Sequence, residues 1–454
     1  MDWRTHRRHA LLVALFVALF AGLWAAPAAA QSDDGSEDGA GELAIFGMLD
    51  YEDPDTGDEL PVAGVTVTVE GVSSAETDAN GEFRIIVPGP GDYAVEIDVA
   101  KLPEGVNLRN PDANPLTASV TENRDRRVLF PLVFGEASDG GSGGTSFRRV
   151  AQLTAEGLKQ GLYLAMAAIG LTLIFGTTGL VNFAHAELVT WGMLSTYFFN
   201  FYGLAGLIGF LAPLPPPFGS GVNLVFAAIL GMISGGLLGY LLNRVIFRGA
   251  RRAGVSLIAQ MVMTIGLSIL LRYLMVYFFG GSPRTFGDFA AQRAIKMGPI
   301  ELTPKDLVAM GLSVLILVGV ASYLELTRMG KAMRAVSDNR ELAESTGIDV
   351  ERVISLVWIA GAALAAASGV FFGLDQAKWD FGFRILLLIF ASVTLGGLGR
   401  PYGALVGALV VGLTINLSTL FIDAEVKNMV ALLIMALILM FRPQGILGRA
   451  ERIG

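Results

Sequence analysis

Residues 330–373 read GKAMRAVSDNRELAESTGIDVERVISLVWIAGAALAAASGVFFG, and this stretch determines how the rest of the chain is interpreted. Its first half is charged and helix-forming, contains a turn glycine at Gly347, and lies between two long apolar runs. Basic residues occur in and around it: Arg328, Lys331, Arg334, Arg340 and Arg352. Short loops rich in Lys and Arg stay in the cytoplasm. The stretch therefore predicts a cytoplasmic loop of a membrane protein, of the kind to which a soluble motor protein can bind.

The composition predicts an integral membrane protein. Hydrophobic residues make up 53% of the 454-residue chain, whose mean hydropathy is +0.57. They occur in runs long enough to cross a hydrocarbon core of about 30 Å. The net charge of -8 indicates no nucleic-acid-binding surface, and the absence of cysteine excludes disulfides and thiolate chemistry.

Nine apolar runs after Phe147 predict an all-α polytopic membrane domain of about nine transmembrane helices over residues 148–454. The runs 383–399 and 402–421 are so close together that one of them is alternatively a re-entrant segment. Arginines place the loops 244–252 and 328–352 and the C-terminus in the cytoplasm. The nine runs are 157–180, 184–203, 222–246, 255–279, 305–325, 353–374, 383–399, 402–421 and 427–441.

The N-terminal residues predict a segment delivered outside the cytoplasm. Residues 1–30 combine a basic start, an apolar core and the sequence Ala28-Ala29-Ala30 before Gln31, which is typical of a cleaved signal peptide. An uncleaved first membrane helix is the alternative. Residues 31–42 form an acidic linker, and residues 136–147 a Gly/Ser linker.

Between the linkers, residues 43–135 predict a small extracytoplasmic β-sandwich. Apolar and polar residues alternate at 65–69, 83–87 and 93–97, with turn residues between these runs. The phrase GVTVTVEG…TDANGEFRIIVPGPGDYAVEI resembles the carboxypeptidase-regulatory-like, prealbumin-like sandwiches. Such a resemblance implies a spacer or binding platform. The acidic cluster Asp50, Asp53, Asp55 and Asp58 lacks the glycine and late glutamate of a calcium loop, so we interpret it as a solvated turn.

Three polar residues interrupt the apolar sequence 179–188, which reads GLVNFAHAEL: Asn182, His185 and Glu187. Polar groups at membrane depth must find partners or line a cavity. Two interpretations stay open, a structural role that caps a broken helix and a direct role on the translocation path. His185 is the last histidine of a chain without cysteine, so no metal site is predicted.

Three segments carry a family resemblance: 179–188, 330–373 and RPQGILGR at 442–449. They resemble the permease subunits of high-affinity branched-chain amino acid ABC importers over roughly residues 150–454. Where that family usually has glycine before the glutamate, this chain has Ala186.

The resemblance implies partners and a coupling loop. A second homologous permease, two cytoplasmic ATP-binding subunits, an extracytoplasmic substrate-binding protein and the membrane lipid would surround this chain, with no nucleic acid. Glu341, Ala343 and Gly347 match the importer coupling motif, and Arg334 and Asp338 are assigned to the same loop. The chain carries no phosphate-binding loop of the Walker type, so we expect a transporter subunit that is not an enzyme, needs no cofactor and depends on ATP used by its partners.

Other functions are compatible with the sequence. A permease of the same family could carry urea or short amides instead of branched-chain or hydrophobic amino acids. An ATP-independent channel or secondary transporter would need no ATPase subunits. A surface module with a passive helical anchor fits poorly, because an anchor needs neither nine apolar runs nor polar residues within them.

Overall fold

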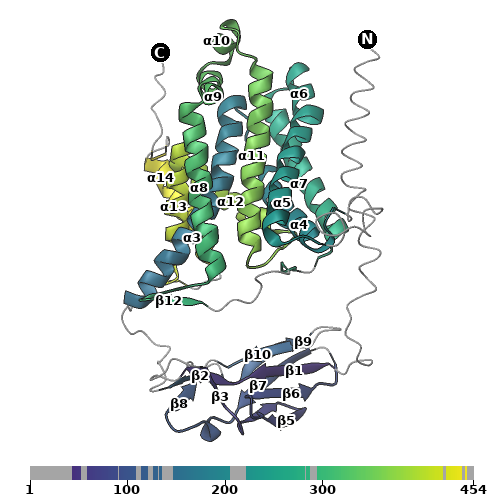
Figure 1. The fold of residues 1–454 in the computed structure, drawn as a ribbon, viewed down its shortest axis with the longest axis vertical. Coiled ribbons are helices and arrows are strands. Elements are labelled where there is room, and N and C mark those ends of the chain that lie inside the picture. Colours follow the sequence, from purple (N-terminus) through teal and green to yellow (C-terminus); the bar gives the residue numbers. More distant parts are fainter. Residues whose placement is uncertain are drawn as a thin grey trace. The chain divides into compact units, whose positions relative to one another are not determined.

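The computed structural model describes residues 43–52, 59–89, 91–108, 114–120, 126–130, 132–134, 147–204, 221–281, 283–286, 294–422, 426–441 and 445–446. These residues form two compact units, one of strands between residues 35 and 146 and one of helices from Phe147 onward (Figure 1). Several predictions concern residues outside the described ones: the signal peptide, the linkers 31–42 and 136–146, the acidic residues 53–58, and nearly all of 442–449.

The strand unit contains two main sheets. One has the order β10-β1-β6 and the other β5-β4-β7-β9, while β2 pairs with β3 and β8 with β11. β1 is parallel to β10 and antiparallel to β6. The elements are β1 (Ala44–Met48), β2 (Asp50–Glu52), β3 (Glu59–Pro61), β4 (Thr66–Val69), β5 (Ser73–Glu76), β6 (Glu82–Ile86), β7 (Gly91–Ile97), a 3-10 turn (Val99–Lys101), β8 (Val106–Leu108), β9 (Leu116–Val120), β10 (Arg126–Leu129) and β11 (Leu132–Phe134).

Both sheets contribute to one apolar core. Alternate residues of β4, β6 and β7 point into it, among them Val67, Ile85 and Val95, each at most 2% exposed. Side chains in a strand alternate between its two faces, so this burial is what the period-2 pattern dictates. The strands predicted at 65–69, 83–87 and 93–97 are therefore confirmed as β4, β6 and β7.

The helical unit contains a helix in each of the nine predicted apolar runs. Its elements are α3 (Phe147–Thr178), α4 (His185–Tyr202), α5 (Leu224–Leu242), a π-helical segment η4 (Asn243–Phe247), α6 (Arg248–Arg252), α7 (Leu257–Phe279), β12 (Ile295–Met297), β13 (Ile300–Leu302), α8 (Pro304–Leu326), α9 (Arg328–Asp338), α10 (Arg340–Ser345), α11 (Val350–Gly373), α12 (Phe381–Gly396), α13 (Pro401–Ser418) and α14 (Lys427–Phe441).

The apolar helices differ in length. Among the described residues, six helical segments are long and apolar enough to cross a membrane: α3, α5 with its continuation through α6, α7, α8, α11 and α13. α12 and α14 are apolar but shorter, with 16 and 15 residues. α3 also begins ten residues before the predicted run, because Gln152 of its polar first turns is tied to the backbone of Glu301 by two hydrogen bonds of 2.8 and 2.9 Å.

The helical bundle has two distinct ends (Figure 1). α6, α9 and α10 lie at one of them, here called the α10 end. The hairpin β12–β13 and the start of α3 lie at the other, the β12 end. Both loops predicted to be cytoplasmic, 244–252 and 328–352, thus come to the α10 end.

Glycines allow the central helices to pack backbone against backbone. A Cβ at Gly369 of α11 would overlap the carbonyl oxygen of Val189 in α4, and one at Gly235 of α5 would overlap Ala366 of α11. In lipid, close packing of small residues replaces the hydrophobic effect as the force between helices. α4, α5 and α11 therefore form a tightly packed group that fixes the position of the polar residues described next.

Candidate functional site

A short non-helical segment, residues 179–184, separates α3 from α4. α3 ends at Thr178, Gly179 follows with a φ of +70°, and α4 begins at His185. The imidazole Nε2 of His185 donates to the carbonyl of Ala167, 3.0 Å away. Ala167 lies eleven residues before the end of α3, about 16 Å along its axis at 1.5 Å per residue. Residues 179–184 therefore return into the bundle without helical structure, and α4 starts deep inside it.

Asn182 and Thr264 satisfy the backbone of this segment. The side-chain oxygen of Asn182 accepts a hydrogen bond from the Ala184 amide at 3.1 Å. The hydroxyl of Thr264, on α7, accepts one from the Phe183 amide, also at 3.1 Å. Non-helical backbone at membrane depth is tolerated only where the protein itself supplies such partners.

Glu187 lies in the first turn of α4 and binds a cation from another helix. Arg272 of α7 donates to Glu187 Oε1 through Nη2 (2.9 Å) and Nε (3.2 Å), and Ser268 Oγ donates to the same oxygen at 3.0 Å. The Arg272 guanidinium also lies 3.9 Å from the ring centroid of Phe383 in α12. The cluster therefore joins α4, α7 and α12.

The structure brings Asn182, His185 and Glu187 together at this buried helix start, each at most 1% exposed. Sequence reasoning missed Ser268 and Arg272, although a single arginine inside the apolar run 255–279 was the available signal. Three atoms of the cluster are buried without a hydrogen-bond partner in the described part of the chain: Asn182 Nδ2, His185 Nδ1 and Glu187 Oε2. Such an atom costs about 1–3 kcal/mol unless water or another group satisfies it.

The predicted coupling loop, 328–352, leads through three helices with capped starts, α9, α10 and α11. The Thr327 hydroxyl accepts from the Gly330 amide at the start of α9, Asn339 from Leu342 in α10, and Asp349 from Arg352 in α11. Each of these contacts satisfies an amide that a helix start leaves unpaired. The sequence therefore fixes sharp boundaries on both sides of the six-residue helix α10.

Gly347 ends α10 with a left-handed turn. Its φ is +87°, and the next amide, of Ile348, returns a hydrogen bond of 3.1 Å to the carbonyl of Ala343. Glycine adopts this conformation without steric cost. The predicted turn is thus in place, and it directs the chain into α11.

The two faces of α10 differ. Ala343 is 3% exposed and packs inward, so its small side chain allows α10 to lie close to the helical bundle. Glu341 is exposed, and Leu342 is 61% exposed. The predicted residues Arg334 and Asp338 lie on the preceding helix α9, where Arg334 forms an ion pair of 2.8 Å with Glu325 of α8.

A second charged network at the α10 end was not predicted. Glu351, in the first turn of α11, lies 3.1 Å from Arg251, 3.3 Å from Arg248 and 3.4 Å from Arg340 of α10. Arg251 also donates to Asn243 Oδ1 at 2.9 Å. Asn243 opens the π-helical segment of the α5–α6 span, a deviation often found at functional sites. One carboxylate thus connects α10 to a membrane helix.

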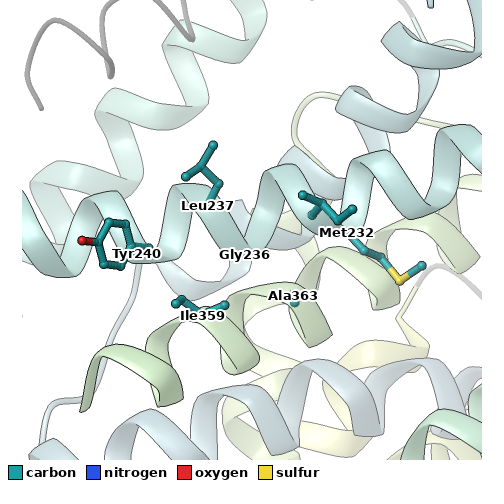
Figure 2. A pocket seen from close by; sticks show the side chains of 7 residues that line it. Met232, Gly236, Leu237, Tyr240, Ile359 and Ala363 are labelled. Atoms are coloured by element: carbon teal, nitrogen blue, oxygen red, sulfur yellow. The ribbon is translucent and has the colours of Figure 1, made fainter. Parts of the chain in front are cut away.

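A third feature is an apolar groove between α5 and α11, of about 540 Å³ (Figure 2). Gly236 and Ala363 keep it open, and Leu237 and Ile359 flank it (Figure 2). Its lining is almost wholly apolar, so it offers no group that could bind a charged solute. In the described part of the chain, no cluster of three His, Cys, Asp or Glu side chains is suited to a metal ion.

Residues 153–439 match the family model described as branched-chain amino acid transport system, permease component. The chain is 30% identical over 302 residues to LivH of Escherichia coli K12, a high-affinity branched-chain amino acid transport system permease protein, covering 65% of this chain and 94% of LivH. It is 28% identical over 308 residues to BraD of Pseudomonas aeruginosa, covering 66% and 96%. LivM of E. coli K12 is 24% identical over 307 residues, covering 62% and 66%.

No solved structure matches this chain significantly. The family match leaves the strand unit outside, since it begins at residue 153. It confirms the predicted resemblance of the helical unit and the expectation of a transport subunit that is not an enzyme. The chain is a multi-pass membrane protein and belongs to the family of permease components of branched-chain amino acid ABC transport systems.

Proposed function

We propose that this protein forms half of the membrane channel of an ABC importer for branched-chain amino acids. Its match over nearly the whole of LivH and BraD carries this proposal. Both of those proteins are described as high-affinity branched-chain amino acid permeases. Similarity to both LivH and LivM supports pairing with a second, homologous permease subunit. Two ATP-binding subunits and an extracytoplasmic binding protein would complete the importer.

The α10 end would face the cytoplasm and bind the ATPase. This orientation is supported by the two arginine-rich loops, which come to the same end of the bundle. Glu341 and Leu342 project from α10, and Gly347 turns the chain back into α11. We assign the contact with the ATPase to these exposed residues and the seating of α10 on the permease to Ala343.

The buried start of α4 would belong to the translocation machinery. A helix that begins inside the bundle carries a partial positive charge there. The unpaired atoms of Asn182, His185 and Glu187 surround this helix start. We propose that they gain partners, either water or cargo, when the permease changes between its outward-open and inward-open states. In the arrangement described here Arg272 holds Glu187 in place.

The strand unit would be an extracytoplasmic module that meets the binding protein or a cell-envelope polymer. Its two sheets with a shared core are compatible with the predicted prealbumin-like sandwich. Deleting residues 35–146 tests this role. Unchanged uptake and unchanged affinity for the binding protein would contradict it.

Reconstitution in vesicles tests the transport function. The chain, its partner permease, the ATPase subunits and the binding protein are incorporated together, and uptake of radiolabelled leucine is measured with and without ATP. We expect ATP-dependent uptake that isoleucine and valine inhibit by competition and urea does not. Competition by urea or short amides alone would reassign the cargo. Uptake without ATP would indicate a channel or secondary transporter.

A further inference from the structure

A cavity of about 560 Å³, with a mostly apolar lining that includes charged side chains, lies at the α10 end of the bundle, next to α9 and α10. The second half of α3, the last turn of α8, the helix α9 and the start of α13 form its walls. Its volume lies within the range of about 300–1,000 Å³ that is usual for small-molecule sites. Since α9 is one of its walls, a ligand here would touch the coupling loop directly.

The walls combine both charges with an apolar floor. Two cationic residues, Arg334 and Arg400, face the cavity together with two anionic ones, Glu325 and Asp338. The Tyr402 hydroxyl donates to Glu325 at 3.1 Å and so joins α13 to the Glu325–Arg334 ion pair. Leu173, Leu324 and Met333 supply the apolar part, each at most 8% exposed.

Thr172, on the α3 wall, has an unsatisfied hydroxyl. The residue is 0% exposed, and its Oγ1 has no hydrogen-bond partner among the residues that the structure describes. The nearby Thr177 and Thr178 of the same helix donate to carbonyls one turn back, at 3.1 and 2.6 Å. An unpaired buried hydroxyl destabilises the fold unless something else satisfies it. Thr172 lines the cavity, so a small shift of this wall would let its hydroxyl bond to a polar group held there.

We propose that this cavity binds a free aliphatic L-amino acid on the ATPase side of the membrane. The ligand carboxylate would pair with the arginines, its ammonium group would pair with Glu325, and its apolar side chain would contact the leucines and the methionine. Thr172 would hydrogen-bond one of the charged ends. A zwitterion with an apolar side chain matches all three properties of the walls, whereas a simple anion or an apolar solute matches only one.

Occupancy of the cavity would slow import, and this step rests on the proposed function. A bound amino acid connects α9 to α3 and α13, so it stabilises one position of the coupling loop relative to the bundle. A ligand that binds one state more tightly shifts the population toward it. Import would therefore decline as the cargo accumulates on the side where it is released.

The test measures binding of labelled L-leucine to the purified complex of both permeases and the ATPase subunits, without the binding protein. We expect saturable binding, and at least about tenfold weaker binding of 4-methylpentanoate, which lacks the ammonium group, and of 3-methylbutylamine, which lacks the carboxylate. Thr172→Val should weaken leucine binding about tenfold. It should also raise the melting temperature of the ligand-free complex. Thr154→Val, an exposed threonine near the other end of α3, is the matched control.

Two outcomes would overturn the proposal. One is no leucine binding to the wild-type complex. The other is that the Thr172→Val and Thr154→Val complexes bind leucine equally well. Glu325→Gln is a second variant, and it must also weaken leucine binding. In vesicles preloaded with leucine, import should slow for the wild type and slow less for Thr172→Val. Failure of ATP-dependent leucine uptake in empty vesicles would instead contradict the proposed function itself.

Discussion

Arg272 of α7 donates hydrogen bonds of 2.9 and 3.2 Å to a single carboxylate oxygen of Glu187, which lies in the first turn of a helix that begins inside the bundle. The Glu187 side chain is completely buried, and Arg272 is 15% exposed. Breaking a buried pair leaves one charge uncompensated, which costs about 3–5 kcal/mol.

Arg272→Leu should therefore destabilise the helical unit more than Glu187→Gln, which keeps a neutral hydrogen-bonding group. We expect the double variant Glu187→Gln/Arg272→Leu to recover part of the loss, because no unpaired carboxylate stays behind. The stability of the wild type and the three variants is measured by heating the detergent-solubilised protein and monitoring the loss of its monomeric elution peak. If Arg272→Leu had the melting temperature of the wild type, the pair would have no structural role.

The contact between α4 and α11 depends on a glycine. A Cβ at Gly369 would overlap the carbonyl oxygen of Val189, so Gly369→Ala should push the two helices apart and cost about 1–3 kcal/mol. Gly266→Ala is the matched control, because Gly266 of α7 is exposed and has open space around it. The control should keep the melting temperature or raise it slightly, because alanine is more favourable than glycine in a helix by up to about 1 kcal/mol. Equal melting temperatures for the two variants would contradict the close contact.

The turn at Gly347 should be essential for coupling. At a φ of +87° a β-branched residue is strained by about 1–2 kcal/mol, so Gly347→Val should shift α10 and reduce ATP-driven uptake severalfold. Gly298, at the turn between β12 and β13, has a φ of +63° and likewise no atom near its Cβ position. Gly298→Val thus imposes similar strain at the opposite end of the bundle. Equal uptake by the two variants would show that strain at the α10 end has no special effect.

Glu351 should transmit movement of α10 to the α5–α6 span, since it contacts Arg340 on one side and Arg251 on the other. Glu351→Gln weakens these ion pairs while it preserves size. We expect fewer leucine molecules imported per ATP hydrolysed, with folding and assembly unchanged. Glu344→Gln, at an exposed position of α10, is the control and should keep the wild-type ratio. If Glu351→Gln imported as many leucine molecules per ATP hydrolysed as the wild type, Glu351 would not transmit the movement of α10.

The sequence predicted nine helices from continuous apolar runs and three strands from alternating apolar and polar residues. Nine apolar runs became nine helices, and the alternation at 65–69 became β4. The number of membrane crossings was less predictable, because length and hydropathy alone do not separate a membrane-spanning helix from a shorter buried helix such as α12.

Individual site residues were predictable where they stand out locally, as with Asn182, Glu187 and Gly347. Their partners were not, because Arg272 is 85 residues from Glu187, and Arg251 is 100 residues from Glu351. Only packing of α4, α7 and α11 brings such residues together. Polar residues in the sequence mark the interruption between α3 and α4. That the chain returns into the bundle there is shown only by the contact of His185 with Ala167.

The most direct test of the account measures uptake and ATP hydrolysis together in vesicles that carry the complete importer. Leu342 is the exposed apolar residue of α10, so Leu342→Asp should disrupt the contact with the ATPase, and Glu344→Gln should not. We predict that Leu342→Asp loses most ATP-driven leucine uptake and also the increase in ATP hydrolysis that loaded binding protein causes. Wild-type uptake and hydrolysis in Leu342→Asp would contradict the claim that α10 couples this permease to its motor.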